Sequence, residues 1–209
     1  MKVVLFNGSP KKKGSTARAL TEVAEQLEAA GIQTETLHLG KDPVHGCVAC
    51  GWCNKNEGCQ FNDDITNTLI EAARGADGFI FGSPVYFAAP NGAMCAVLDR
   101  AFYAKASIFA GKPGAAVAVA RRGGTTATID RLNKYFSFAH MPIVGSQYWN
   151  ILHGNNAAEV EQDLEGMQTM RALGRNMASL LKSLEAGKAG GEVLPAPSDE
   201  DRVWTNFIR

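Results

Sequence analysis

The sequence predicts an α/β fold, a parallel sheet of five strands with helices on both faces. Short apolar runs alternate along the chain with segments of helical periodicity, and this alternation is typical of parallel sheets. Several of the runs are apolar at every position, as in strands that are buried on both faces. The length of 209 residues suffices for one well-filled core and is short for two domains.

Ten elements are expected to follow one another along the chain. In order, they are strand 2–7, helix 15–30, strand 34–39, helix 64–74, strand 78–82, helix 92–104, strand 114–120, helix 126–139, strand 143–152 and helix 157–184. The strands are the apolar runs, except that the second alternates polar and apolar positions. The first helix can be capped by Ser15 and is ended by Gly31. Asp63 and Asp64 stand where they can cap the second helix.

Ligands of such a sheet bind at the carboxyl ends of its strands. The loop after the first strand, residues 7–16, runs into the start of a helix, where free N–H groups and the helix dipole favour a phosphate. Ser9, Ser15 and Thr16 add hydroxyl groups, and the lysines at 11–13 add positive charge. The loop lacks the glycine patterns of nucleotide and dinucleotide loops, and it better suits a phosphate monoester. The alternative is a capped turn with solvated lysines.

The loop after the third strand, residues 83–92, begins with Ser-Pro-Val-Tyr-Phe. This segment offers a rigid apolar edge with exposed backbone amides, and an isoalloxazine ring needs both. Aromatic residues at such a place can also belong to the core or to an interface. After the fourth strand, Gly123 and Gly124 either let the backbone approach a ligand closely or form a simple turn.

Four of the five cysteines, Cys47, Cys50, Cys53 and Cys59, fall within thirteen positions of one loop. Thiolates this close together can share a metal centre. Their spacing differs from the paired C-x2-C units of structural zinc sites. Free thiols, a disulfide and zinc are the alternatives to an iron–sulfur cluster. Because the loop follows the second strand, we expect it at the same end of the sheet as the phosphate loop.

Together these motifs resemble the NAD(P)H-dependent FMN reductase family, whose fold is flavodoxin-like with strand order 2-1-3-4-5. The resemblance covers about residues 1–155 and rests on Gly8-Ser9-Pro10, Gly14-Ser15-Thr16, Ser83-Pro84-Val85-Tyr86 and Leu98-Asp99-Arg100. It implies that the FMN phosphate binds Ser9, Lys11, Ser15 and Thr16. It also implies that the flavin ring lies against Pro84, Val85, Tyr86 and Phe87, with Gly123 and Gly124 on the far side.

The cysteine spacing resembles the iron-sulfur flavoprotein branch of that family, in which a compact cysteine motif ligates a [4Fe-4S] cluster beside FMN. This resemblance implies that Cys47, Cys50, Cys53 and Cys59 are the cluster ligands. Relatives with similar loops also include flavin-only reductases. Cys95 departs from the family pattern and receives no role. The family further implies a homodimer or a higher homo-oligomer.

The 21 basic and 21 acidic residues balance, so neither a nucleic-acid partner nor a membrane surface is expected. No apolar run approaches the ~20 residues that a membrane span needs. The clustered cysteines are unlike a secreted disulfide scaffold, and we expect a cytoplasmic protein. The flavodoxin-like FMN-binding domain is expected over 1–185, followed by an extended arm over 186–209. The arm carries Val203, Trp204, Phe207 and Ile208, which could reach across a partner subunit.

Two further features are expected to be structural. Asp99 and Arg100 are interpreted as an ion pair on a helix surface or a link between protomers, and the former is favoured. His153 is interpreted as a hydrogen-bonded structural histidine, and the alternative is contact with a substrate or exchange of protons.

The predicted function is an FMN oxidoreductase that takes electrons from NAD(P)H and passes them to a flavin, a quinone or another acceptor. If the cysteine loop holds a cluster, a carrier protein becomes the better acceptor. No side chain is expected to act as an acid or a base. One alternative is a non-enzymatic electron carrier, although flavodoxins tend to be strongly acidic. Another is a metal or redox sensor that uses the cysteine loop.

Overall fold

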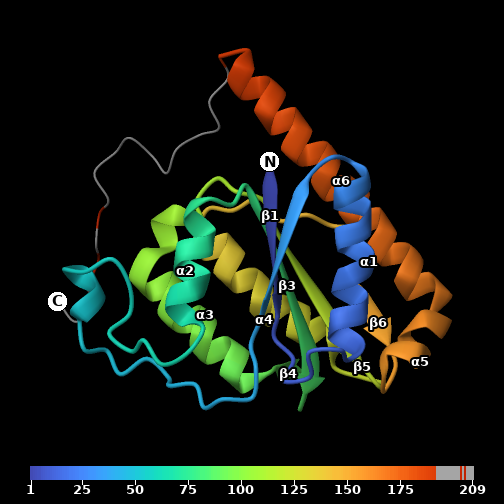
Figure 1. The fold of residues 1–209 in the computed structure, drawn as a ribbon, viewed down its shortest axis with the longest axis horizontal. Coiled ribbons are helices and arrows are strands. Elements are labelled where there is room, and N and C mark those ends of the chain that lie inside the picture. Colours follow the sequence, from blue (N-terminus) through green and yellow to red (C-terminus); the bar gives the residue numbers. More distant parts are fainter. Residues whose placement is uncertain (192–202, 204, 206–209) are drawn as a thin grey trace.

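The computed structural model describes residues 1–191, 203 and 205 (Figure 1). Five parallel strands form its sheet in the order β2-β1-β3-β5-β6. They are β1 (Lys2–Asn7), β2 (Gln33–His38), β3 (Gly78–Tyr86), β5 (Gly114–Ala120) and β6 (Ile151–His153). A sixth, two-residue strand, β4 (Ala89–Pro90), pairs antiparallel with the end of β3. Among the parallel strands this is the predicted order 2-1-3-4-5, so the fold class is confirmed.

Helices cover both faces of the sheet (Figure 1). One face carries α1 (Ser15–Ala29), α5 (Ala157–Gln162) and α6 (Leu164–Ala189). The opposite face carries α2 (Thr66–Arg74), α3 (Gly92–Lys105) and α4 (Thr125–Phe138). Two short 3-10 helices, Trp52–Asn54 and Ala106–Ile108, lie in the loops on this second side.

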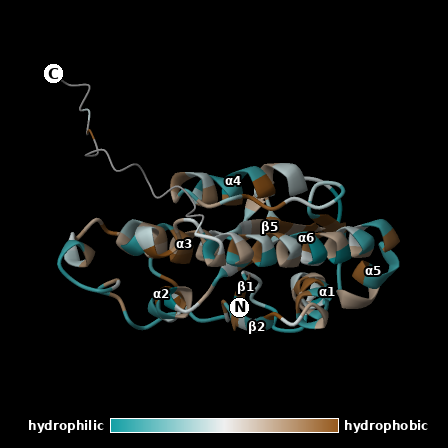
Figure 2. Ribbon diagram, turned by 90° about the horizontal axis from the view of Figure 1, so that it is seen from above, coloured by the Kyte–Doolittle hydropathy of each residue, from teal (hydrophilic) through white to brown (hydrophobic). Residues whose placement is uncertain are grey.

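The strand side chains alternate between the two faces, because successive Cβ atoms of a strand point in opposite directions. In β1, Val3 and Leu5 belong to the cluster under α1 and α6, whereas Val4 and Phe6 belong to the cluster under α2, α3 and α4. All four side chains are fully buried. Figure 2 shows α4 and α1 on opposite sides of β5, whose ribbon is coloured as hydrophobic. The sheet is therefore buried on both faces, as its apolar runs predict.

Several boundaries differ from the predicted ones. The third strand does not end at Gly82 but continues to Tyr86, because β5 and β4 both supply pairing partners for its last residues. The fifth parallel strand is short, and the beginning of the predicted strand 143–152 contributes one isolated bridge, from Ile143 to Gly114. The predicted helix 157–184 is divided at Asp163. The backbone of Asp163 is not helical, and its carboxylate accepts the Gly166 N–H at 2.9 Å to start α6.

The long final helix extends beyond its predicted end. Because α6 reaches Ala189, residues 186–189 of the predicted arm are helical. Most of the remaining arm, with Trp204, Phe207 and Ile208, lies outside the described residues. Within the described part of the chain, no helix has both the length and the hydrophobicity that crossing a bilayer requires.

A buried carboxylate joins α1 to α6. Glu22 of α1 accepts a hydrogen bond from Arg18 at 2.8 Å and another from Arg171 of α6 at 2.6 Å. Its side chain is 7% exposed. Burial favours the neutral acid, but the two guanidinium groups outweigh this effect and lower the pKa of Glu22. Ionised Glu22 therefore holds together the two main helices on this face.

Replacing Glu22 by glutamine should lower the free energy of unfolding by about 1–2 kcal/mol at neutral pH, because both arginines lose a charged partner. Ionised Glu22 contributes to the free energy of unfolding at pH values above the ordinary carboxyl pKa. This contribution is lost as the pH falls through the lowered pKa that Glu22 has in the folded protein. The difference between Glu22→Gln and the wild type should therefore shrink in acid. Urea unfolding at neutral and acidic pH measures this difference, and a difference that persists in acid would contradict the assignment.

Candidate functional site

The loop after β1 is fixed at the carboxyl edge of the sheet, where the parallel strands end. The Gly8 N–H donates to the Gly82 carbonyl of β3 at 2.8 Å. The Ser9 N–H donates to Asn7 Oδ1 at 3.0 Å, and the Lys11 N–H donates to Ser9 Oγ at 3.1 Å. A Cβ at position 8 would lie 2.1 Å from Met94 Sδ, so the loop backbone packs directly against α3. The loop is therefore held in place by contacts to β3 and α3 and by hydrogen bonds within itself.

The start of α1 leaves backbone donors free at this edge. Gly14 precedes the helix, and Ser15 is its first residue, so the predicted capping by Ser15 is wrong. The Ser15 hydroxyl instead donates to the Gly154 carbonyl at 3.4 Å. The N–H groups of Ser15, Thr16 and Ala17 have no acceptor among the described residues, as is usual in the first turn of a helix. They remain available for an anion.

A cavity of about 180 Å³ opens beside these donors. It is lined by Ser9, Lys11, Ser15, Thr16, Pro84, Val85, Tyr86, Val119, Ala120, Arg121, Gly154 and Asn155. Seven of the ten predicted flavin contacts thus surround one cavity. The five lining residues from 119 onward were missed. They end β5 or follow β5 and β6, and their position at strand ends is the signal that could have identified them. Of these five, Arg121 adds a second cationic side chain to that of Lys11.

The end of β3 turns back into β4 through the two residues Phe87 and Ala88. Both have positive φ, 51° and 57°, as in the tight turns that join antiparallel strands. A left-handed backbone costs about 1–2 kcal/mol per residue with a Cβ, so this turn is strained. The turn leaves Phe87 fully exposed. Phe87 does not line the cavity.

Gly124 supports this hairpin from the other side. Its φ is +94°, and a Cβ there would lie 2.8 Å from the Ala88 Cα and 2.9 Å from Val85 Cγ1. Gly124 therefore allows the start of α4 to touch the hairpin, and does not line the cavity itself. A Cβ at position 123 would have no atom within 4 Å, and Gly123 does not line the cavity either.

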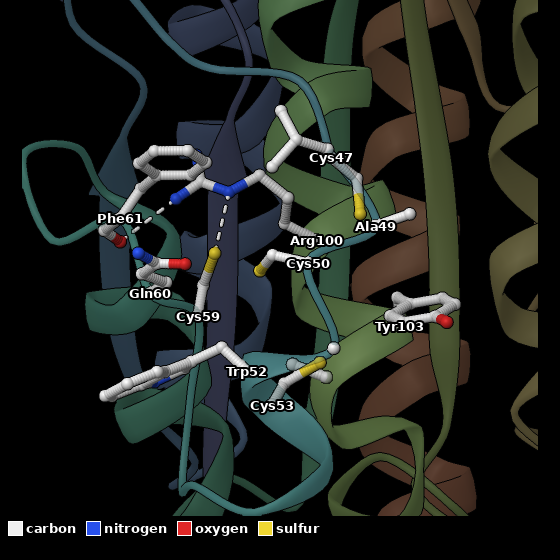
Figure 3. Close-up of a pocket in the computed structure, with 13 residues that line it drawn as sticks. Cys47, Ala49, Cys50, Trp52, Cys53, Cys59, Gln60, Phe61, Arg100 and Tyr103 are labelled. Atoms are coloured by element: carbon white, nitrogen blue, oxygen red, sulfur yellow. Dashed lines mark hydrogen bonds between the residues drawn. The ribbon is translucent and has the colours of Figure 1, made fainter.

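The four loop cysteines surround a second concavity, shown in Figure 3. Its lining consists of Cys47, Val48, Ala49, Cys50, Gly51, Trp52, Cys53, Cys59, Gln60 and Phe61 from the loop, with Arg100, Tyr103 and Ala104 from α3. Cys47 and Cys50 are exposed, while Cys53 and Cys59 are half-buried. The structure therefore brings all four predicted metal ligands to one place.

A buried arginine lies under the cysteine pocket. The side chain of Arg100 donates from Nε to Cys59 Sγ at 3.1 Å, from Nη1 to the His45 carbonyl at 3.2 Å and from Nη2 to the Phe61 carbonyl at 3.0 Å. It also forms an ion pair with Asp64, and both side chains are almost completely buried. Burial disfavours the charged guanidinium, but the bonds to Cys59 and Asp64 outweigh it and raise the pKa of Arg100.

The predicted ion pair of Asp99 with Arg100 is wrong, because adjacent residues of a helix do not face each other. Asp99 faces α4, where its carboxylate accepts hydrogen bonds from Arg131 at 3.1 Å and from the Tyr135 hydroxyl. Burial and the bond to Asp99 raise the pKa of Tyr135 well above its usual range. The sequence offered no signal for the inward direction of Arg100.

The remaining predicted structural roles are found in part. The residue that caps α2 is Ile65, without a side-chain bond, so the predicted capping by Asp63 or Asp64 is wrong. Asp64 precedes the cap and accepts the Thr66 N–H at 2.9 Å. Asp63 instead lies 3.5 Å from the His45 ring. The His153 ring lies 3.7 Å from Asp163, whose carboxylate also accepts the His153 N–H at 2.7 Å.

Cys59 is the most firmly held of the four cysteines. Its N–H donates to Asn67 Oδ1 at 2.8 Å, and Asn67 Nδ2 donates to its carbonyl at 3.0 Å. Among the described residues, it is also the one loop cysteine whose thiol is hydrogen-bonded to another side chain. Both its backbone and its sulfur are therefore fixed by the protein.

The thiols are not arranged for a single metal ion. Over the described residues, no three His, Cys, Asp or Glu side chains stand close enough together to hold one. A tetrahedral zinc would place its thiolates about 3.8 Å apart, since the Zn–S distance is about 2.3 Å. A four-iron cluster instead bonds its ligands at four separate corners and spaces them more widely. Four thiolates are the donor set that a [4Fe-4S] cluster needs, and all four cysteines line this one concavity.

The two sites lie toward opposite ends of α3. The Asn91 side chain caps the start of this helix beside the hairpin, whereas Arg100 and Tyr103 lie in its second half. With a rise of 1.5 Å per residue, Arg100 is about 14 Å along the axis from Asn91. Figure 1 shows the cysteine loop, coloured light blue to cyan, beside α2 and α3 and away from the start of α1. The cysteine pocket is therefore separated along α3 from the cavity at the carboxyl edge.

Comparison with known proteins relates this arrangement to flavoproteins. Residues 1–156 match the sequence profile of the NADPH-dependent FMN reductase family. An iron-sulfur flavoprotein of Methanocaldococcus jannaschii is 30% identical over 193 residues, which cover 88% of this chain and all of that protein.

Solved structures confirm the fold. A flavodoxin, WrbA-like protein from Agrobacterium tumefaciens has a TM-score of 0.60 at 18% identity, covering 87% of this chain and 97% of its own. An NAD(P)H:quinone oxidoreductase from Methanothermobacter marburgensis has a TM-score of 0.64 at 17% identity, covering 85% and 96%.

The flavodoxin-like fold, the cavity at the carboxyl edge and the family profile define a flavin-binding oxidoreductase. The chain belongs to the NADPH-dependent FMN reductase family. Within that family, its similarity to the methanogen protein places it in the iron-sulfur flavoprotein branch.

Replacing Gly124 by alanine should lower flavin affinity and destabilise the protein by about 1–3 kcal/mol, because the methyl group meets the strained hairpin and the residue has positive φ. Gly123→Ala is the matched control, since its Cβ would enter open space. Flavin fluorescence titration and urea unfolding measure the two effects. Equal behaviour of the two variants would show that the contact of Gly124 with the hairpin does not matter.

Proposed function

We propose that the protein is an NAD(P)H-dependent FMN oxidoreductase whose cysteine loop holds a [4Fe-4S] cluster. The observation that carries the flavin assignment is the meeting of four strand ends, those of β1, β3, β5 and β6, and the start of α1 around one cavity. Parallel α/β sheets bind their ligands at this place. The four thiols around one concavity carry the cluster assignment.

The phosphate of FMN would bind at the start of α1. The N–H groups of the first turn have no acceptor among the described residues, and Ser9, Ser15 and Thr16 line the cavity. Lys11 and Arg121 would balance the phosphate charge. Only one such place is present among the residues lining the cavity, which suits a monophosphate better than the pyrophosphate of FAD.

The ring of the flavin would lie along the edge formed by Pro84, Val85 and Tyr86. The cavity of about 180 Å³ is smaller than the ~300–1,000 Å³ of typical ligand pockets. A flavin nucleotide would therefore fill it and extend over its rim, where Tyr86 is half exposed. When bound, the flavin would supply the redox chemistry, which is transfer of two electrons from a nicotinamide to an acceptor. The protein contributes binding and orientation.

Cys47, Cys50, Cys53 and Cys59 would hold the cluster, which would add transfer of single electrons to a carrier protein. Without a cluster, a quinone, a free flavin or another small molecule is the better acceptor. A non-enzymatic electron carrier differs from both by its inability to oxidise NAD(P)H in steady state. A metal or redox sensor differs by metal binding without turnover.

We also propose a homodimer or a higher homo-oligomer. Phe87 at the hairpin is fully exposed, and Tyr103 beside the cysteine pocket is 62% exposed. A second subunit that covered these aromatic side chains would remove apolar surface from water at both sites.

The decisive experiment is anaerobic expression with ample iron and sulfide. About four iron atoms per chain are expected, with broad visible absorption beneath the flavin bands. Substitution of any loop cysteine by serine should reduce the iron, whereas Cys95→Ser is the control that should retain it. Iron-free protein that still oxidises NAD(P)H would reject the cluster and leave a flavin-only reductase. Light scattering of the same preparation tests the oligomer, which a monomeric mass would exclude.

The double replacement Ser15→Ala and Thr16→Ala should weaken FMN binding. Each lost charge-assisted hydrogen bond to the phosphate is worth on the order of 1.5–3 kcal/mol. Riboflavin, which lacks the phosphate, should bind both proteins equally and is the matched control. Fluorescence titration measures both affinities. Unchanged FMN affinity in the double variant would place the phosphate elsewhere, and release of FAD from the purified protein would overturn the choice of flavin.

A further inference from the structure

We propose that Arg100 is a positioning residue for the cluster. It holds Cys59 in place, and it raises the reduction potential of the cluster by donating a hydrogen bond to the Cys59 sulfur. The inference rests on the proposed cluster in the cysteine loop. It concerns a residue of α3 that carries no cluster ligand and that the sequence pattern placed on the helix surface.

Arg100 joins the two ends of the cysteine loop. One bond reaches the carbonyl of His45, before the first cysteine, and another reaches the carbonyl of Phe61, after the last. The guanidinium also lies over the Phe61 ring, 5.4 Å from its centre, and this ring stacks on His45 at 4.6 Å. The loop therefore closes around one side chain. Figure 3 shows the bonds from Arg100 to Cys59 and to Phe61.

The charge of Arg100 is fixed and shielded from water. Its side chain is 1% exposed, and that of its partner Asp64 is 3% exposed. Asp64 is fixed in turn by the Thr66 N–H at the start of α2. The guanidinium has fixed donors and a fixed fork geometry, so it cannot swing toward another acceptor. Nε–H points at Cys59 Sγ as a consequence of the other three contacts.

A positively charged donor at a ligand sulfur changes the electron affinity of an iron–sulfur centre. Gain of one electron adds one negative charge, which is shared with the sulfur ligands. A hydrogen bond from a cation stabilises that added charge more than it stabilises the oxidised state, so it raises the reduction potential. Because the donor is buried, bulk water screens it weakly. The negative charge of Asp64 opposes the effect from the far side of the guanidinium.

Two substitutions should move the potential in opposite directions. Arg100→Lys keeps the charge beside Asp64 but replaces the fork by a single ammonium, so the bond to Cys59 is lost and the potential should fall. Asp64→Asn keeps Arg100 but removes the opposing negative charge, so the potential should rise. Each change should alter the ratio of oxidised to reduced cluster about threefold to tenfold, or about 28–59 mV for one electron.

The measurement is a redox titration of the anaerobic holoprotein, monitored by electron paramagnetic resonance of the reduced cluster, together with iron analysis. Arg131→Lys is the matched control, because Arg131 pairs with Asp99 on the other side of α3 and does not line the cysteine pocket. The reduction potential of the cluster in Arg131→Lys should equal that in the wild type.

The outcomes separate this inference from the proposed function. Shifts in opposite directions support it. A role of Arg100 limited to loop stability would move both variants the same way or lower the iron content without a shift, and either result overturns the inference. If one variant loses its iron, the direction in which the reduction potential of the other variant shifts decides. Wild-type protein without iron overturns the cluster itself and this inference with it, whereas iron-loaded variants with unchanged potentials overturn the inference alone.

Discussion

The parallel pairing of β1 with β2 on one side and β3 on the other is the constraint on which the rest of the structure depends. Parallel strands end at the same edge, so the loop after β1 meets the end of β3, and the Gly8–Gly82 hydrogen bond joins them. The helix that follows must start at that edge and cross back over the sheet. The N–H groups of its first turn, which have no acceptor among the described residues, are therefore brought to that edge by chain direction before any side chain is considered.

The cysteine loop depends on a different interaction. Apart from one short 3-10 helix, the described residues between β2 and α2 form neither helix nor strand, so ladder hydrogen bonds do not hold them. The buried Arg100–Asp64 pair replaces those bonds and ties the loop to α3. Burying such a pair is costly, and breaking it would leave a buried charge without a partner. The loop must therefore keep the arrangement that holds Asp64 against Arg100. It also draws the cysteines about two turns along α3, away from the cavity at the carboxyl edge.

Two of the four non-glycine residues with positive φ in the described part of the chain lie at the edge beside the cavity, and the others are Ala49 and His140. Phe87 and Ala88 adopt left-handed backbone in a two-residue turn, and Gly124 packs on that turn with a conformation suited to glycine. Strained residues persist where their surroundings over-determine them, and they often mark ligand sites. Here the pairing of Tyr86 with Ala89 and the close approach of α4 impose the turn. The rigid end of β3 is what a flat aromatic ligand would need.

The sequence alone determined the order of strands and helices, the position of the loop after β1 beside the start of α1 and the grouping of the four cysteines. These features follow from local apolar runs, from chain direction and from close spacing in the chain, which need no knowledge of distant contacts. The tertiary structure alone decided that β3 continues to Tyr86, that Asp163 divides the last helix and that Phe87 points into water. It also decided that Arg100 turns inward to Cys59 while its neighbour Asp99 turns to α4. The continuation of β3 and the inward turn of Arg100 depend on partners more than 30 residues away, as in the pairing of Pro84 with Val119 and of Arg100 with Asp64, and only the packed chain brings such partners together.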